Sequence, residues 1–305
     1  MGVRLTARAA GSSIRRLNAG RSAVVKHLRD VESVRPHLER ERAYSAYALA
    51  YLDKRLFPMA DFHEATSGDR TALVMHARGG LGPSMFTLGD AALVAQLLSL
   101  HPGPRQAFVT CDPEHIDTVL TTHNVWRPQT MLRMQLSRQD FTPPAENPAV
   151  RRLIEVDAFD LNRLYSEEST RYTGRQIVEG VYFGGYHRGW LVAAAGTHIY
   201  SNREGIAVIG NVFTHQDFRG RGLGTAVTAA VASHLLQSCD LIVLNVDPAN
   251  RTARHVYEQL GFQDTGRLVE AMATRRHAYS PIPALRRTLA RYRATVPNTE
   301  LVSLP

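Results

Sequence analysis

The chain of 305 residues has 36 Lys and Arg against 28 Asp and Glu, a formal net charge of +8, and 44% of its residues are hydrophobic. This composition is typical of a globular protein long enough for two domains, and no apolar run approaches the ~20 residues that a membrane-spanning helix needs. Two cysteines, Cys111 and Cys239, and thirteen histidines without an H-E-x-x-H pair predict neither a disulfide framework nor a metal site, so we expect a reducing, cytoplasmic location.

The positive charge is concentrated at the two ends of the chain. Residues 1–29 contain seven Lys or Arg and no acid, and residues 275–293 contain six arginines and no acid. We expect residues 1–30 to be a basic, disordered extension, with an over-long start or a targeting segment as alternatives. No nucleic-acid-binding motif accompanies the charge, so we expect no specific nucleic-acid partner.

Residues 31–138 have the pattern of a mixed α/β domain. Tyr44, Tyr47 and Tyr51 fall at helical spacing within 41–56, which predicts a helix with one apolar face. Core or domain-interface packing is the expected role of these tyrosines, and a ligand cage is the alternative. The other expected elements are strands at 71–77, 85–88, 106–111 and 130–136 and helices at 90–100 and 113–122.

A proline-containing linker at 139–148 precedes a second predicted domain, residues 149–275. A basic tail, residues 276–305, follows it and includes a short amphipathic helix at 284–295, which we interpret as a docking helix rather than a membrane-surface helix. The elements expected in the second domain are strands at 149–154, 177–186, 190–200, 206–214, 241–246 and 268–273 and helices at 157–164, 225–236 and 251–260.

A glycine loop organises the second domain. Arg219-Gly220-Arg221-Gly222-Leu223-Gly224 stands between a β-branched strand and a stretch of helix formers. Glycines let the backbone approach a ligand, and the first N–H groups of a helix have no intrahelical partners, so the loop predicts an anion site suited to pyrophosphate. No lysine follows Gly224, which excludes a Walker loop, and the even spacing excludes the Gly-x-Gly-x-x-Gly dinucleotide pattern. A tight turn without a ligand is the alternative.

With the residues downstream, this loop resembles the GNAT superfamily, the general-control-type N-acetyltransferases. The match includes the acyl-CoA pyrophosphate signature Arg-x-x-Gly-x-Gly at 219–224 and a second signature formed by Asn250, Tyr257 and Gly261-Phe262. The resemblance implies an α/β (α+β) fold with a mixed, mostly antiparallel central sheet flanked by helices. It also implies acetyl-CoA, or another acyl-CoA, as co-substrate, an amine acceptor and no metal.

Residues 31–138 look like a degenerate copy of the same fold, which would place two such domains in tandem. Where the pyrophosphate loop would fall, the chain has Thr87-Leu-Gly-Asp-Ala91. Asp90 puts a negative charge where a phosphate would lie, so we expect this half not to bind CoA. Its expected role is to form one wall of the acceptor cleft.

The resemblance also assigns roles to residues of the second domain. Tyr257 would be the general acid, because a phenol with a pKa near ~10 can share a proton with the leaving thiol. The edge of the strand at 212–214 would bond the pantetheine arm and donate to the oxyanion, and Asn250 would also bond the pantetheine. The implied cofactor-binding residues are Val212, Phe213, Thr214, Arg219, Gly220, Arg221, Gly222, Leu223, Gly224 and Asn250.

The general base is left open by the resemblance. Some members of the superfamily have a glutamate where this chain has Asn245, whose amide cannot take a proton at neutral pH and would instead orient a water or the acceptor. The candidate bases are Glu179, His198 and His215. Relay through water to an exposed carboxylate is an alternative.

Three functions are compatible with these residues. The leading one is an acyl-CoA-dependent N-acyltransferase that moves acetyl to a primary amine of a small or amino-acid-like acceptor by direct attack. The second is acetylation of a protein N-terminus or lysine, and the third is a non-catalytic acyl-CoA-binding sensor. The sequence leaves open the acceptor, the acyl length and whether the protein is a monomer or a homodimer.

Overall fold

The computed structural model describes residues 22–166, 171–294 and 296–303. The strands are β1 (Ser22–Leu28), β2 (Ala60–Ser67), β3 (Arg70–Ala77), β4 (Ser84–Gly89), β5 (Gln106–Cys111), β6 (His123–Leu136), β7 (Val150–Arg152), β8 (Tyr182–His187), β9 (Trp190–Ser201), β10 (Ile206–Thr214), β11 (Leu241–Val246), β12 (Gln263–Arg275) and β13 (Thr299–Ser303). The α-helices are α2 (Val31–Leu38), α3 (Ala46–Ala50), α4 (Ala91–Leu100), α5 (Ile116–Thr122), α6 (Ala158–Leu164), α7 (Gly174–Glu179), α8 (Leu223–Leu235), α9 (Arg251–Gln259) and α10 (Ile282–Arg293).

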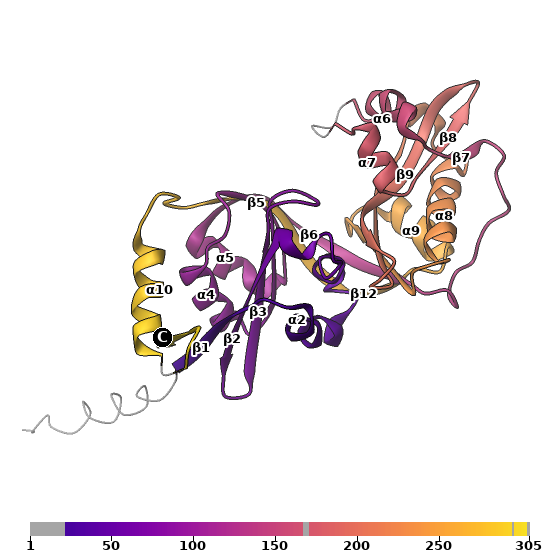
Figure 1. Cartoon of the computed structure of the whole chain (residues 1–305). Coiled ribbons are helices and arrows are strands. Elements are labelled where there is room, and N and C mark those ends of the chain that lie inside the picture. The colour runs from indigo at the N-terminus through magenta and orange to yellow at the C-terminus, as the bar shows by residue number, and fades with distance from the viewer. Residues whose placement is uncertain (1–21, 167–170, 295, 304–305) are drawn as a thin grey trace, which may run out of the picture.

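The described strands form one thirteen-stranded sheet in the order β13-β1-β2-β3-β4-β5-β12-β6-β11-β10-β9-β8-β7. Two neighbouring pairs, β4 with β5 and β10 with β11, are parallel. The other pairs are antiparallel. The predicted α/β class, with helices flanking a mostly antiparallel sheet, is therefore confirmed, and Figure 1 shows the sheet divided between two lobes.

Two long strands connect the lobes, as Figure 1 shows. β6 belongs to the amino-terminal part of the sequence, yet its residues 132–136 pair with β11 of the carboxy-terminal part. In return, residues 269–274 of β12 pair with β5, and β6 and β12 also pair with each other. The sheet therefore runs without interruption through both predicted domains, 31–138 and 149–275.

Alternating side chains of β10 contribute to two different cores. Ala207 and Ile209 point to the core beneath α8, whereas Ile206 and Val208 point to the core beneath α3. This is the two-residue period of a strand that is covered on both faces. Because α3 comes from the amino-terminal lobe, a helix of that lobe covers the sheet of the other.

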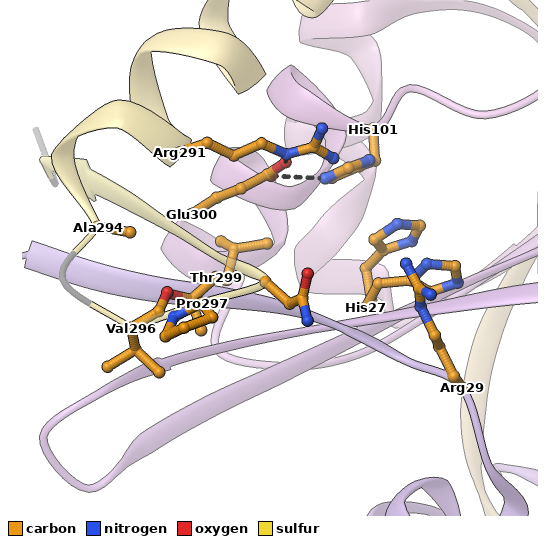
Figure 2. Close-up of a pocket in the computed structure, with 12 residues that line it drawn as sticks. His27, Arg29, His101, Arg291, Ala294, Val296, Pro297, Thr299 and Glu300 are labelled. Carbon is orange, nitrogen blue, oxygen red and sulfur yellow. Dashed lines mark hydrogen bonds and ion pairs between the residues drawn. The ribbon is translucent and has the colours of Figure 1, made fainter.

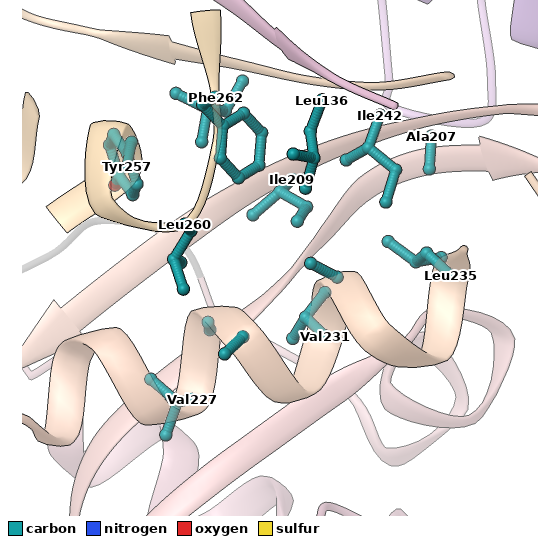
Figure 3. Close-up of a cluster of buried hydrophobic side chains, with 14 of the residues drawn as sticks. Leu136, Ala207, Ile209, Val227, Val231, Leu235, Ile242, Tyr257, Leu260 and Phe262 are labelled. Carbon is teal, nitrogen blue, oxygen red and sulfur yellow. The ribbon is translucent and has the colours of Figure 1, made fainter. Parts of the chain in front are cut away.

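The core beneath α8 is closed by side chains at helical spacing. Val227, Val231 and Leu235 recur every four residues on α8 and are buried against the sheet. Figure 3 shows them facing the sheet, with Tyr257 of α9 in the same cluster. Burial of each such aliphatic side chain stabilises the fold by about 1.5–3 kcal/mol, and this core fixes the position of the glycine loop that precedes α8.

Near the two ends of the described chain, the structure corrects the expected extent of the amino-terminal extension and supports the expected docking helix. The predicted disordered extension, 1–30, is too long, because it contains β1, which pairs with β2 and β13; residues 1–21 lie outside the described part. In β1 the buried Ala23 and Val25 alternate with more exposed residues, a strand pattern that the surrounding basic residues masked. In the tail, Arg287 of α10 donates to the carbonyl of Leu100, the last residue of α4, at 2.5 Å, so α10 docks on this lobe.

Several predicted elements are wrong in extent, and the strands expected at 130–136 and 268–273 are in fact the longer β6 and β12. The strand expected at 177–186 begins only at Tyr182, because Thr173 and Gln176 form a capping box that starts α7. The helix expected at 41–56 is reduced to the short α3, and all the side chains from Ala46 to Leu52 are buried rather than one face of them. Strand β2 was not anticipated, since its sequence mixes polar and apolar residues.

Candidate active site

The sheet opens between β10 and β11. The parallel pairing runs only as far as Ile209 opposite Leu244, although both strands continue beyond it. After this point β10 carries an irregularity between Gly210 and Phe213, with Asn211 in the left-handed region at φ 54°. The backbone of β10 beyond Ile209 therefore has no pairing partner on its β11 side. The carbonyls of Asn211 and Thr214 accept from Tyr165 and Arg219, and other polar groups of this segment can bond an extended ligand.

The glycine loop lies at the amino terminus of α8. Gly222 precedes Leu223, the first helical residue, and cannot cap the helix with a side chain. Gly220 and Gly222 both have φ 73°, and a Cβ built on either meets no atom within 4 Å. Open space beside uncapped first-turn N–H groups fits a phosphate of acyl-CoA. Leu223 itself packs into the core, and a Cβ at Gly224 would touch the hydroxyl of Thr214 at 3.2 Å.

Contacts within the chain hold the loop in shape. Nε of Arg219 donates to the carbonyl of Thr214 at 3.1 Å, and the Arg221 guanidinium donates to the carbonyl of Asp217 at 3.2 Å. Arg221 also stacks over the ring of Phe218 at 5.1 Å. Both guanidinium groups thus remain beside the helix terminus, where they add positive charge to an anion site.

The predicted pantetheine residues 212–214 lie on β10 beyond Ile209, and the predicted Asn250 and Tyr257 lie on α9. Val212 packs toward α8 and Phe213 toward α6. The Asn250 side-chain oxygen accepts from the N–H of Ala253 at 3.0 Å and so caps α9; its amide N–H₂ is the part that can donate to a ligand. Tyr257 is 6% exposed, and burial raises its pKa to about 12, so the phenol stays protonated at neutral pH and can donate.

Five polar side chains converge on the α3 side of the opening: Tyr47, Arg133, His198, Asn245 and Glu270. Asn245 and Arg133 are paired neighbours on β11 and β6. The amide of Asn245 donates to a Glu270 oxygen at 2.5 Å, Arg133 lies 5.3 Å from the Tyr47 ring, and the His198 ring lies 6.4 Å from the same ring. We call these residues the polar cluster.

Sequence reasoning found two members of the polar cluster, His198 and Asn245, and missed three. Arg133 lay within an expected strand, Tyr47 was interpreted as packing, and Glu270 stood in the final strand without a motif around it. The remaining candidate bases lie elsewhere. Glu179 is exposed on α7 and pairs with Arg175 at 2.7 Å.

His215 lies at the end of β10 in a cavity of about 680 Å³. Phe213, Arg219 and Trp190 are among the residues that line the cavity, and no member of the polar cluster does. The Nδ1 atom of His215 accepts from the N–H of Asp217 at 3.4 Å. Its neighbours thus include the arginine that begins the glycine loop rather than the members of the polar cluster.

The amino-terminal lobe repeats the strand, helix and parallel strand of the glycine-loop region as β4, α4 and β5. At the amino terminus of α4 a carboxylate takes the place of an anionic ligand. Asp90 accepts from the N–H of Leu93 at 3.0 Å and lies 3.3 Å from the guanidinium of Arg70. This geometry supports the expectation that the amino-terminal lobe does not bind CoA, because its helix terminus already has a capping charge.

A second cavity, of about 450 Å³, lies in the amino-terminal lobe beside β13. Figure 2 shows His27, Arg29, His101, Arg291 and Glu300 around it. Glu300 bridges two of these groups, His101 at 2.8 Å and Arg291 at 3.0 Å. Within the described ranges, no three His, Cys, Asp or Glu side chains are placed to hold a metal ion, and no helix there is both long and apolar enough to cross a membrane.

Comparison with known proteins gives the family. The FR47-like protein family matches residues 182–272. Over 117 residues, 35% of this chain and 77% of the relative, the chain is 30% identical to a spermine/spermidine N(1)-acetyltransferase of Bacillus subtilis. Two solved structures share the fold: a GCN5-related N-acetyltransferase from Kribbella flavida, with 15% identity and TM-score 0.51 over 77% of this chain and 94% of that one, and a Drosophila protein, with 13% identity and TM-score 0.58 over 82% and 98%.

The chain therefore belongs to the GNAT superfamily, as its two motifs indicated. It is an N-acetyltransferase, and its family implies acetyl-CoA as co-substrate.

Proposed function

We propose that this enzyme transfers the acetyl group of acetyl-CoA to a primary amine of a small molecule. The observation that carries the proposal is the glycine loop at the start of α8, directly beside the point where β10 and β11 part. Together they offer an anion site for the pyrophosphate and an unpaired strand edge for the pantetheine arm. The relative that acts on spermine and spermidine supports a small amine as acceptor.

The proposed chemistry assigns a separate task to each part of the opening. First-turn N–H groups of α8, with Arg219 and Arg221, hold the pyrophosphate, and the β10 backbone beyond Ile209 donates to the thioester oxygen. The acceptor nitrogen attacks the thioester carbon, and Tyr257 protonates the departing sulfur.

Peptide acetylation is the second candidate. Helix α3 of the amino-terminal lobe covers part of the carboxy-terminal sheet, over Ile206 and Val208, on the face where the polar cluster lies. This cover favours a compact acceptor over an extended peptide. The assay is thiol release from acetyl-CoA with a panel of polyamines, amino acids, N-terminal peptides and lysine peptides. Turnover with peptides alone would overturn the small-amine proposal, and binding without any turnover would favour a sensor.

Replacing Tyr257 with Phe tests its proposed role as general acid. We expect Tyr257→Phe to lower kcat by about 100-fold, because the thiolate loses its proton donor. Acetyl-CoA affinity, measured by calorimetry, should stay unchanged. The control is Tyr51→Phe, which removes a buried hydroxyl that donates to the Gly79 carbonyl at 2.6 Å in the other lobe. Full activity in Tyr257→Phe would assign this tyrosine to packing alone.

A further inference from the structure

The polar cluster stands at the vertex of the strand opening. Gly210 and Asn245 are the first residues after the last β10–β11 pair, Ile209 with Leu244. The His198 ring covers Gly210, since a Cβ there would lie 2.0 Å from its Nε2. Asn245 holds Glu270 at 2.5 Å. A histidine and a carboxylate thus flank the place where a thioester carbonyl would reach the unpaired edge of β10.

Two elements besides its own strand act on Glu270. The amide of Asn245 donates to it from β11, and Tyr47 of α3 interacts with it electrostatically. Glu270 is half-buried at this position. A half-buried carboxylate that a neighbouring amide holds in place is suited to receive a cation.

Arg133 is a buried cation near the Glu270 carboxylate. It is 1% exposed, and its three guanidinium nitrogens make no hydrogen bond to the described part of the chain. A buried cation of this kind is costly unless an anion compensates it. Glu270 is an anion that acts on it electrostatically, and the Tyr47 ring covers its face at 5.3 Å. The charge of Glu270 therefore compensates the buried charge of Arg133.

We propose that Glu270 binds the ammonium group of the acceptor and takes the proton that the nitrogen releases before attack, with Asn245 and Tyr47 as positioning residues. This inference rests on the proposed function. Glu270 takes one proton from the ammonium, and the resulting neutral amine attacks the thioester carbon. The N–C bond forms and the C–S bond breaks, and the sulfur leaves as CoA with one proton from Tyr257. The second proton that the nitrogen loses restores the Tyr257 phenol, and Glu270 releases its proton to solvent.

Charge favours Glu270 over His198 for this role. Burial and the charge of Arg133 both lower the pKa of His198, and the nearby Arg133 cation disfavours a second positive charge on this ring, whereas a carboxylate attracts an ammonium. For Glu270, burial raises the pKa, while Arg133, Asn245 and Tyr47 oppose the rise. A carboxyl group with a raised pKa is the better base near neutral pH.

The test compares Glu270→Gln, Glu270→Asp and the exposed control Glu114→Gln in the full chain, with acetyl-CoA and the best amine of the panel. We expect Glu270→Gln to lower kcat/KM by roughly 10²- to 10³-fold. Acetyl-CoA affinity should be retained, Glu270→Asp should recover part of the loss, and Glu114→Gln should match the wild type. Wild-type kcat/KM in Glu270→Gln would overturn the inference, whereas a wild type inactive on every amine would overturn the proposed function itself.

Tyr47→Phe tests the assignment of Glu270 as the base even if Glu270→Gln does not fold. Tyr47 lowers the pKa of Glu270, so removal of its hydroxyl should raise that pKa and move the acidic limb of the kcat/KM profile to higher pH. A merely structural Tyr47 would lower Tm without moving that limb. An unmoved limb in a folded Tyr47→Phe would contradict the assignment of Glu270 as the base.

Discussion

Gly222→Ala should weaken acetyl-CoA binding by roughly 10- to 100-fold or more. The new methyl group would occupy the open space next to the first-turn N–H groups of α8, where no atom now lies within 4 Å. Each charge-assisted hydrogen bond that the pyrophosphate loses is worth about 1.5–3 kcal/mol, and every 1.4 kcal/mol is about tenfold in affinity. Titration calorimetry of acetyl-CoA into wild type and variant measures the difference directly.

Backbone strain needs its own control, because Gly222 has φ 73° and alanine is disfavoured there. Gly68 offers it: it has φ 62°, lies in the turn between β2 and β3 and likewise has no atom within 4 Å of a built Cβ. Gly68→Ala and Gly222→Ala should therefore lose similar stability, about 1–2 kcal/mol. Only Gly222→Ala should lose acetyl-CoA. Normal acetyl-CoA binding by Gly222→Ala would mean that the glycine loop is a tight turn that does not bind the pyrophosphate.

The sequence was most informative where a function depends on adjacent residues. The two motifs, Arg219 to Gly224 and the residues Asn250 and Tyr257, lie within forty residues of one another. Their residue types and spacing can be recognised without a structure. The helix from Leu223 and the strand to Thr214 follow from local propensity and period. Local signals of this kind also placed α4 and β5, but they failed for β1, whose strand pattern is short and flanked by basic residues.

The polar cluster could not be predicted because long-range strand pairing creates it. Glu270 and Asn245 are 25 residues apart, and Tyr47 and Glu270 are separated by most of the chain. Arg133 joins Asn245 only because β6 crosses from one lobe to the other. Tyr47 joins the same cluster only because α3 covers β10. Neither the crossing of β6 nor the packing of α3 has a local sequence signature, and both depend on a single sheet that runs through the two lobes.

This exchange of strands has a consequence for catalysis. Arg133 and Tyr47 both come from outside residues 149–275, the predicted catalytic domain, while Glu270 comes from its last strand. A fragment that begins at residue 149 would keep the glycine loop and lose the tyrosine and the arginine beside Glu270. If the amino-terminal half forms a wall of the acceptor cleft, as we expect, Tyr47 and Arg133 are the residues that it contributes beside Glu270.

Acid should destabilise the protein well above the pH at which carboxylates titrate. His63, His76 and His123 are 8%, 3% and 0% exposed, and burial lowers their pKa values to about 2, 3 and 4. Two rings flank His63, His27 at 4.7 Å and His101 at 3.9 Å, at the cavity of Figure 2. The folded state therefore excludes protons that the unfolded chain binds below its ordinary histidine pKa of about 6.5.

The sign follows from this difference in proton binding. Above pH 7 all three rings are neutral in both states and contribute nothing, whereas below about 6.5 only the unfolded state gains protons, so stability falls with pH. Between pH 7 and 5, each ring lowers the free energy of unfolding by about 2 kcal/mol, and the three together lower it by about 6 kcal/mol. This is a large share of a typical folding free energy. Urea unfolding at pH 7, 6 and 5 measures the loss.

A single substitution separates this effect from general acid denaturation. His63→Phe keeps an aromatic ring between His27 and His101 but removes one titrating group. The loss of unfolding free energy between pH 7 and 5 should then shrink by about 2 kcal/mol, while the exposed control His255→Gln should leave it as in the wild type. An equal loss in His63→Phe would contradict the prediction, because it would mean that His63 takes up its proton at the same pH in the folded and unfolded states.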